Sequence, residues 1–322
     1  MPKVSIVIVN YNYGKYLDER IRTILNQSYR DFELIIIDNG STDNSVEVIN
    51  RYISDTRVLP KFYPENDLPF KRWNEALNSA TGDYFLITAA DDSSYPALLE
   101  KTVEKLDKHP SVGIAFSQSW DIDDQGKQLR SWKEWTDNLD KERWAKDFID
   151  DGKNECQYLL FQCTIPNPSA ALIRRTVFLE AGKFDTSFRY LADWMLWVKM
   201  LLISDIAFIS EPLNNFRTHT GSLTNATRQS LEFEERVRII NYLYINIKAT
   251  DETWEAVYNQ TIGYWSNLIL ENKISFDKSK KIYNILQSMD QNLNYRLARH
   301  LIKYGWRNFI DMFSYKTVNI KE

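Results

Sequence analysis

The chain has 322 residues, of which 43% are hydrophobic and 26% are charged, so it is long enough for one large globular domain or two smaller ones. Its formal net charge of −4 gives no general attraction to nucleic acid, and its two cysteines and three histidines are too few to build a metal site of their own. No stretch approaches the roughly 20 apolar residues that a membrane span requires, so we expect a protein of the cytoplasm or of a membrane surface.

Strand and helix patterns alternate along the first third of the chain. The β-branched and uncharged segment VSIVIVNY indicates a strand that is buried on both faces, as in a parallel sheet. The predicted strands are VSIVIVNY, FELIII, RVLPKF and DYFLITA, and the predicted helices are KYLDERIRTILNQ, SVEVINRYI, FKRWNEALNSAT and YPALLEKTVEKLDKH. Their alternation predicts a doubly wound α/β sheet with right-handed crossovers.

Polar clusters follow three of these strands: NYNYG, DNGSTDNS and ADDSS. Ligands bind at the carboxyl ends of the strands in such sheets, so we expect one edge to gather Tyr11, Asp38, Ser41, Asp91 and Asp92. The segment NYNYGKYL has one glycine where a dinucleotide site shows GxGxxG, and no GxxxxGK[ST] occurs. These two absences argue against a dinucleotide cofactor and against ATP hydrolysis.

The remainder of the chain is first mixed and then helical. Residues from about 112 to 222 hold further strand patterns, the aromatic insertion SWKEWTDNLDKERW and the apolar helix ADWMLWVKMLL, whereas only helical patterns follow. We therefore expect an α/β domain at residues 1–225, divided into halves at 1–110 and 111–225, and a helical region at residues 226–322.

Six segments, in this order, resemble the family 2 glycosyltransferases, which are inverting enzymes of the GT-A fold. They are SIVIVNYNYGKYL, NQSYRDFELIIIDNGSTDNS, NEALNSATGDYFLITAADD, PSAALIRRTVFLEAGKFD, YLADWMLWVKM and NFRTHTGSLT. The resemblance implies a Rossmann-like, mixed and mostly parallel sheet flanked by helices, with a C-terminal helical appendage. The first half of the α/β domain would bind the nucleotide sugar, and the second half would bind the acceptor and supply the catalytic base.

The same resemblance implies a reaction. A sugar would move from a nucleotide-diphosphate sugar, with a UDP- or dTDP-sugar favoured, to a hydroxyl of a saccharide or lipid-linked saccharide. Such enzymes assemble bacterial surface polysaccharides and glycans. A catalytically weakened nucleotide-sugar-binding module is the alternative, because Ala89 and Ala192 stand where relatives carry acids.

The strand-end acidic motif of the family is DxD, and its positions here are Ala89, Ala90 and Asp91, followed by Asp92. The resemblance implies that Asp91 binds a divalent cation, and hard carboxylate oxygens suit Mn²⁺ or Mg²⁺. Such a cation stabilises the departing nucleoside diphosphate. The alternative is that Asp91 and Asp92 cap a helix that starts near Tyr95.

The resemblance also implies contacts to the donor. Asp38 would hydrogen-bond the base, Tyr11 would stack on it, and Arg217 and His219 would contact the diphosphate or, for His219, the metal. Ser41 and Asp43 are interpreted as helix caps. Further donor-binding residues are predicted to be Val9, Asn10, Lys71, Arg72, Asn74 and Ala90, with Trp73 at the position where relatives place a basic residue.

Inverting transfer needs a base that removes the proton of the acceptor hydroxyl. In the family this base is an aspartate that opens a helix, so the segment LADWMLW implies Asp193, with simple helix capping as the alternative. We expect Trp132, Trp135 and Trp144 on the acceptor side of the cleft, or in an apolar patch. Trp194 either lines the cleft or joins Trp197 in the core.

The C-terminal segment NYRLARHLIKYGWRNFIDMF is basic and amphipathic in a protein that is acidic as a whole. Its apolar side chains lie among Arg296, Arg299, Lys303 and Arg307, and Asp311 is its only acid. This pattern predicts peripheral contact with an anionic membrane, at the inner face of the cell membrane. Packing on the α/β domain or on a second subunit is the alternative.

Overall fold

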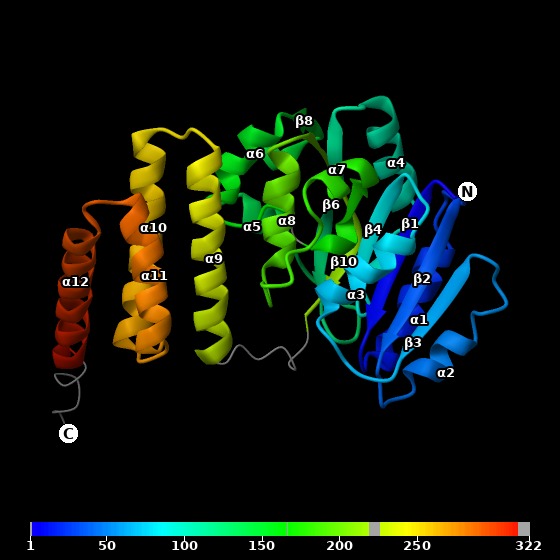
Figure 1. The fold of residues 1–322 in the computed structure, drawn as a ribbon, viewed down its shortest axis with the longest axis horizontal. Helices are drawn as coiled ribbons and strands as arrows, with labels where there is room; N and C mark the ends of the chain where they lie inside the picture. Colours follow the sequence, from blue (N-terminus) through cyan, green and yellow to red (C-terminus); the bar gives the residue numbers. More distant parts are fainter. Residues whose placement is uncertain (1, 166, 219–225, 315–322) are drawn as a thin grey trace, which may run out of the picture. The chain divides into compact units, whose positions relative to one another are not determined.

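The computed structural model describes residues 2–165, 167–218 and 226–314. The chain divides into two compact units, Met1–Ser222 and Leu223–Glu322, of which the first is α/β and the second is helical (Figure 1). Across the described ranges, no helix has the combination of length and apolar character that crossing a bilayer requires.

Four parallel strands form the first half of the sheet, in the order β3-β2-β1-β4. They are β1 (Val4–Asn10), β2 (Phe32–Asn39), β3 (Val58–Tyr63) and β4 (Tyr84–Ala89). The most apolar segments occupy the central positions β1, β2 and β4, where both faces are buried. Pro60 lies in β3 at the edge of the sheet, where a residue without an N–H group is tolerated.

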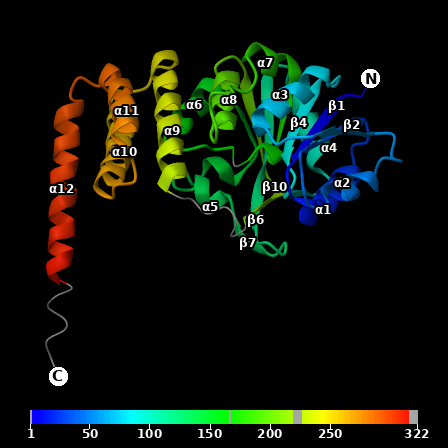
Figure 2. The same ribbon diagram turned by 60° about the horizontal axis from the view of Figure 1, so that its bottom comes forward.

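Helices cover both faces of this half (Figure 2). On one face, α1 (Gly14–Leu25), α2 (Ser45–Asn50) and α4 (Leu98–Lys108) share an apolar core with β1, β2 and β4. The other face is covered by α3 (Pro69–Ser79) and α7 (Arg175–Glu180), whose aromatic side chains pack together with Phe85 and Phe184.

The second half of the sheet makes it mixed. β9 (Ala171–Arg174) runs antiparallel between β4 and β6 (Val112–Ile122), and β10 (Asp205–Arg217) runs parallel to β6. Three short strands complete it: β5 (Ser93–Ser94) and β8 (Phe148–Asp150) on β10, and β7 (Gln128–Ser131) on β6. The expected mixed sheet flanked by helices is thereby confirmed.

The segments around β8 and β9 hold the remaining helices of the first unit. These are α5 (Lys133–Thr136), α6 (Gly152–Leu159) and α8 (Ala192–Leu201), with 3₁₀ turns η1 (Arg143–Ala145) and η2 (Pro168–Ala170). α8 is apolar on nearly all sides because it is buried, and Trp197 within it is fully buried, which confirms its placement in the core.

The second unit consists of α9 (Ala226–Asn246), α10 (Asp251–Leu270), α11 (Phe276–Met289) and α12 (Leu293–Ser314). Hydroxyl caps begin two of them: Thr250 accepts from the Thr253 amide at 3.1 Å and Ser275 from the Lys278 amide at 3.4 Å. The helices enclose a core of their own that contains Ile262, Trp265, Ile282 and Leu286, as the C-terminal helical patterns predict.

Candidate active site

Asn10 and Asp38 lie opposite each other at the carboxyl ends of β1 and β2. The Asn10 side-chain amide donates to Asp38 Oδ1 at 3.0 Å and to Ser41 Oγ at 3.1 Å, and the Ser41 amide donates to Asp38 Oδ2 at 3.0 Å. The Asp38 carboxylate is therefore buried and fixed, at 2% exposure. Each carboxylate oxygen can accept more than one hydrogen bond, so this geometry leaves acceptor capacity for a ligand donor.

The loops after β1 and β2 are joined by Asn12. Its backbone adopts the left-handed region at φ 57°, which Asn tolerates better than most residues, and its side-chain oxygen accepts from the Thr42 amide at 2.8 Å. Beside it, Tyr11 is 41% exposed and Val9 is half-buried at the strand end. The strand ends thus present an exposed aromatic ring next to a buried carboxylate.

Asp43 fixes the starts of two helices, as the capping interpretation predicts. It accepts from the Gly14 amide at 2.9 Å, at the first residue of α1, and from the Ser45 amide at 3.0 Å, at the first residue of α2. Burial opposes its charge, but these hydrogen bonds outweigh burial and lower the pKa of Asp43. The capping interpretation is wrong for Ser41, whose hydroxyl serves Asn10 and Asn12 instead of a helix end.

The basic residues of α3 differ in their surroundings. Arg72 is buried at 8% exposure, where its guanidinium lies 3.7 Å over the Tyr63 ring and Nε donates to Asn39 Oδ1 at 2.8 Å. Lys71 is exposed and pairs with Asp67 at 2.5 Å, so its ammonium group lies at the surface. Of the two, only Lys71 can reach a ligand without a rearrangement of the protein.

Asn74 and Trp73 support the packing of α3. The side chain of Asn74 forms two hydrogen bonds with the backbone of Phe184, donating to its carbonyl at 2.9 Å and accepting from its amide at 3.1 Å. The Trp73 ring packs against Phe70 and Phe184. Both side chains therefore hold α3 against the segment after α7.

The two adjacent aspartates after β4 have different environments. α4 begins at Leu98 and is preceded by Ala97 without a side-chain cap, so the alternative that Asp91 and Asp92 cap this helix is wrong. Asp92 is 1% exposed and accepts from Ser169 Oγ at 2.5 Å and from the Arg217 amide at 3.0 Å. Asp91 is half-buried at the strand end.

A fully buried arginine lies under this acid pair. Arg20 of α1 donates to Ser94 Oγ at 2.8 Å and to Thr88 Oγ1, and Thr88 in turn bonds Ser169 at 3.1 Å. Burial lowers the pKa of Arg20 to about 10, against the attraction of Asp92 and Asp91, so it remains charged at neutral pH. Burial, followed by the charge of Asp91, raises the pKa of Asp92 to about 7.

Asp193 lies in the first turn of α8, where the sequence analysis predicts the base. Its carboxylate is half-buried, and Oδ1 accepts from the Trp194 amide at 2.8 Å, so it also interacts with the helix start. Burial, followed by the negative charge of Asp193, raises the pKa of the Cys163 thiol. The loop that carries Cys163 thus lies close to Asp193.

The aromatic insertion contributes one exposed ring to the same neighbourhood. Trp135 is 43% exposed, and its indole N–H donates to the Cys163 carbonyl at 3.0 Å. Trp132 packs edge-on against Trp135, at 5.8 Å between ring centroids, and against Phe216 at 5.5 Å. Trp144 and Trp194 are buried, at 1% and 7% exposure, so of the four candidate acceptor tryptophans these two pack in the interior.

Arg217 is 4% exposed and donates to several protein groups, including the Asp91 carbonyl at 2.7 Å. Its guanidinium is thus not open to a diphosphate in this structure. His219, the other residue predicted from the same segment, lies outside the described residues.

The carboxylates at this site fit a divalent cation that a phosphate-bearing ligand brings with it. Within residues 2–165, 167–218 and 226–314, no group of three or more His, Cys, Asp or Glu side chains is arranged to hold a metal ion. Mg²⁺ and similar ions at nucleotide sites take one or two protein carboxylates, and the remaining ligands are phosphate oxygens and water. Asp91 can supply one such carboxylate, whereas the carboxylate of Asp92 is buried in its own hydrogen bonds.

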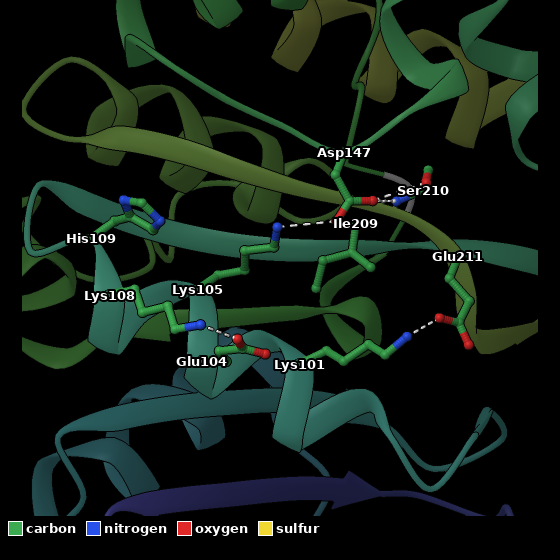
Figure 3. A pocket seen from close by; sticks show the side chains of 9 residues that line it. All are labelled: Lys101, Glu104, Lys105, Lys108, His109, Asp147, Ile209, Ser210 and Glu211. Atoms are coloured by element: carbon green, nitrogen blue, oxygen red, sulfur yellow. Dashed lines mark hydrogen bonds and ion pairs between the residues drawn. The ribbon is translucent and has the colours of Figure 1, made fainter.

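A hollow lies beside α4 (Figure 3). Three lysines line it, and each has an acidic partner: Lys101 with Glu211, Lys105 with Asp147 at 3.0 Å, and Lys108 with Glu104. His109 forms the C-cap of α4, as its position before a proline indicates. The paired charges leave this hollow without a net attraction for an anionic ligand.

Comparison with known sequences places these features in a family context. The model of glycosyl transferase family 2 matches residues 5–181, which is more than half of the chain. An uncharacterized glycosyltransferase of Rickettsia typhi is 29% identical over 232 residues, covering 72% of this chain and 69% of the relative. An uncharacterized glycosyltransferase of Haemophilus influenzae is 25% identical over 325 residues, covering 94% and 91% of the two chains.

Two solved structures share the architecture. The structure of S. aureus TarS 1-349 in complex with UDP-GlcNAc is similar with a TM-score of 0.68 and 16% identity, over 94% of this chain and 89% of that one. The mannosyltransferase PcManGT from Pyrobaculum calidifontis, in complex with GDP-Man and Mn²⁺, is similar with a TM-score of 0.58 and 16% identity, over 96% and 88%. At these identities the likeness concerns the fold alone, and it confirms the expected GT-A architecture.

Proposed function

The chain belongs to glycosyl transferase family 2, and on that premise we propose that it transfers a sugar from a nucleoside-diphosphate sugar to a hydroxyl of a saccharide, with inversion at the anomeric carbon. The observation that carries this proposal is the placement of Asp91 directly after β4, on the same sheet edge as the buried Asp38 and the exposed ring of Tyr11. In this proposal residues 1–110 bind the donor, and residues 111–225 bind the acceptor and provide the base.

Each residue has a chemical task in the proposed reaction. Asp38 accepts a hydrogen bond from the base of the donor, which favours uracil or thymine because both carry an N3–H group. A cation held by Asp91, Mn²⁺ or Mg²⁺, neutralises charge on the departing nucleoside diphosphate. Asp193 takes the proton of the acceptor hydroxyl, and the partial positive charge of the α8 N-terminus keeps its carboxylate ionised until then.

A thermal-shift screen tests the proposed donor class. The purified chain is heated with UDP-, dTDP- and GDP-sugars, each with and without Mn²⁺, and GDP-sugars belong in the panel because PcManGT binds GDP-Man. A ligand at 100 times its Kd adds about 2.7 kcal/mol to the free energy of unfolding, so one donor should raise the Tm clearly, and more so with Mn²⁺. No shift with any sugar nucleotide would contradict the proposal.

A catalytically weakened binding module is the second candidate function. It is favoured by Ala89 and Ala192, which stand where relatives carry acidic residues. Such a module would give the same thermal shift, but it would release no nucleoside diphosphate from the donor that it binds.

We place the acceptor against the exposed ring of Trp135. Aromatic faces pack against sugar C–H groups, and hydrogen bonds from Trp135 to the Cys163 carbonyl and from Gln162 to the Trp135 carbonyl, at 2.7 Å, hold the ring near Asp193. Trp132 supports it from the edge.

The expected result is that Trp135→Ala raises the KM for the acceptor about tenfold or more and leaves the KM for the donor unchanged. Trp132→Ala should have a smaller effect in the same direction. Tyr264→Ala, which removes a ring of 42% exposure from α10, is the matched control. Steady-state kinetics with each substrate varied in turn measure both KM values. A change confined to the donor KM would refute the placement of the acceptor against Trp135.

The exposed face of α12 supports peripheral binding to an anionic membrane, at the inner face of the cell membrane. Tyr295 and Ile302 are 70% and 61% exposed, and Arg299 and Lys303 are exposed beside them at helical spacing. Arg296 does not belong to this face, because it pairs with Glu255 and with Asp290 at 2.8 Å. Of the other apolar and charged residues of the predicted amphipathic segment, Leu297 and Leu301 are half-buried, and the side chains of Tyr304, Trp306, Arg307 and Asp311 lie outside the described residues.

We expect the full chain to cosediment with phosphatidylserine vesicles at low salt and Arg299→Glu/Lys303→Glu to remain in the supernatant. Each basic residue near such a surface contributes about 1 kcal/mol, and salt screens the attraction. Lys248→Glu/Lys280→Glu, at exposed positions outside α12, is the control with the same change in charge. If neither protein pellets and the chain instead dimerises through α12, a second copy is the partner of this face.

A further inference from the structure

Arg217 is a buried charged residue whose contacts the proposed reaction does not yet explain. It ends β10 and is bonded to both aspartates that follow β4, 126 and 125 residues away in the sequence. Its Nε donates to the Asp91 carbonyl at 2.7 Å, and its backbone amide donates to Asp92 Oδ1 at 3.0 Å. One residue therefore holds the backbone of the first aspartate and the carboxylate of the second.

The other nitrogens of the same guanidinium bind two further segments. Nη2 pairs with Glu19 of α1 at 2.7 Å, and Nη1 donates to the carbonyls of Asp123 and Asp124 at 3.0 and 3.3 Å, in the turn between β6 and β7. The guanidinium also lies 4.8 Å from the centroid of the Tyr16 ring. Three separate segments thus meet at one planar cation.

This arrangement depends on the shape of arginine. The guanidinium presents N–H groups in fixed directions in one plane, whereas the ammonium of lysine is a point charge on a flexible stem. A lysine at this position can neutralise Glu19, but it cannot reach the Asp91 carbonyl and the turn carbonyls at the same time.

The charges of Asp91 and Asp92 explain why these hydrogen bonds from Arg217 are useful. When both carboxylates are ionised, Asp91 and Asp92 are like charges on adjacent residues, and the repulsion between them favours any motion that separates them. Arg20 beneath the pair and Arg217 beside it supply two positive charges within the protein. Since Asp92 is buried and fixed, the orientation of the peptide between the two acids determines where the Asp91 carboxylate points.

We propose that Arg217 is a positioning residue, which fixes the Asp91–Asp92 peptide so that the Asp91 carboxylate is held ready for a divalent cation on the donor diphosphate. The inference rests on the proposed function of Asp91. It gives Arg217 a different role from a direct contact with the diphosphate, because each nitrogen of its guanidinium already donates to a protein group.

Mn²⁺ binding to Arg217→Lys tests this role. Electron paramagnetic resonance measures free Mn²⁺ in the presence of saturating UDP or, in a parallel series, GDP, and calorimetry measures nucleotide affinity without metal. We expect the Kd for Mn²⁺ to rise about tenfold while the metal-free nucleotide affinity stays unchanged. Arg57→Lys is the matched control, because Arg57 also pairs with a carboxylate, Asp55 at 2.7 Å, and lies over an aromatic ring, Phe32.

Hydrogen exchange gives a readout that needs no ligand. In Arg217→Lys the amides of residues 88–94 and 120–127 should exchange faster than in the wild type and in Arg57→Lys. If Arg217→Lys fails to fold, Glu19→Gln, which keeps the guanidinium and loosens one of its partners, should show the same pattern with a smaller rise in the Kd.

The outcomes separate this inference from the proposed function. If the wild type binds no Mn²⁺ with either nucleotide, the proposed function of Asp91 fails, and the exchange data alone decide whether Arg217 fixes the acid pair. Unchanged Mn²⁺ affinity together with unchanged exchange at residues 88–94 would overturn the inference. A loss of metal-free nucleotide affinity would overturn it as well, because it would make Arg217 a direct ligand.

Discussion

Asp193→Asn should abolish measurable transfer while it leaves donor binding nearly intact. Removal of a general base costs about 10² to 10⁴ in rate, because the acceptor hydroxyl then loses its proton without assistance. The amide oxygen of Asn can accept from the Trp194 amide as Asp193 Oδ1 does, so the variant can keep this hydrogen bond and removes the basicity alone. The initial rate of nucleoside diphosphate release in the presence of acceptor measures the effect.

Asp151→Asn is the matched control for that variant. Asp151 accepts from the Lys153 amide at 2.7 Å as the N-cap of α6, and it has no proposed part in catalysis. If Asp193 acted only as a cap, the two variants would behave alike. Turnover near the wild-type level in Asp193→Asn would exclude it as the base.

Asp91→Ala should weaken Mn²⁺-dependent donor binding by a factor on the order of 10², because a cation that bridges to the diphosphate supplies several kcal/mol of electrostatic stabilisation. Excess Mn²⁺ should restore the binding only in part. Calorimetry of donor binding with and without metal measures both effects. Equal donor affinity of the variant and the wild type, with metal present, would assign the role to another residue.

Asp92→Ala serves as the comparison, because it should mainly lower the free energy of unfolding. It leaves the Ser169 hydroxyl and the Arg217 amide without their acceptor and removes the negative charge nearest to the buried Arg20. Loss of one partner from a buried charged network costs about 3 kcal/mol or more of unfolding free energy. The two adjacent aspartates should therefore differ in urea denaturation, where Asp92→Ala loses stability and Asp91→Ala does not.

The parallel half of the sheet was predictable because β1, β2 and β4 are long apolar segments buried on both faces and alternate with helical patterns. Strands β5, β7 and β8 were not, since each has two to four residues and forms only through its pairing with β6 or β10. The local sequence pattern does not reveal these strand pairings.

The hydrogen-bond partners of the polar residues were also not predictable from the sequence. The sequence identifies Arg72, Asn74 and Arg217 as polar groups near a site, but their partners lie 33, 110 and 126 residues away. Those contacts show how the protein holds these side chains, and their roles toward a donor stay predictions. The roles of Asp38, Asp91 and Asp193 toward a substrate stay predictions.

The buried Arg20 did leave a signal in the sequence. It lies three residues after Leu17 and four before Ile24, so it occupies the apolar face of α1. A charged residue on such a face requires buried partners, and the hydroxyl groups of Thr88 and Ser94 provide them. An arginine on the apolar face of α1 therefore indicates a buried polar network, and in the structure this network lies beneath Asp91 and Asp92.

Release of nucleoside diphosphate from sugar nucleotides tests the central claim most directly. The purified chain is incubated with UDP-, dTDP- and GDP-sugars, Mn²⁺ and a panel of saccharide acceptors, with EDTA and Asp91→Ala as controls. We predict release from at least one donor that requires the divalent cation and falls at least about 100-fold in Asp91→Ala. Release that is the same with EDTA and in Asp91→Ala, or binding of a donor with no release at all, would contradict the claim that this strand-end site performs metal-assisted glycosyl transfer.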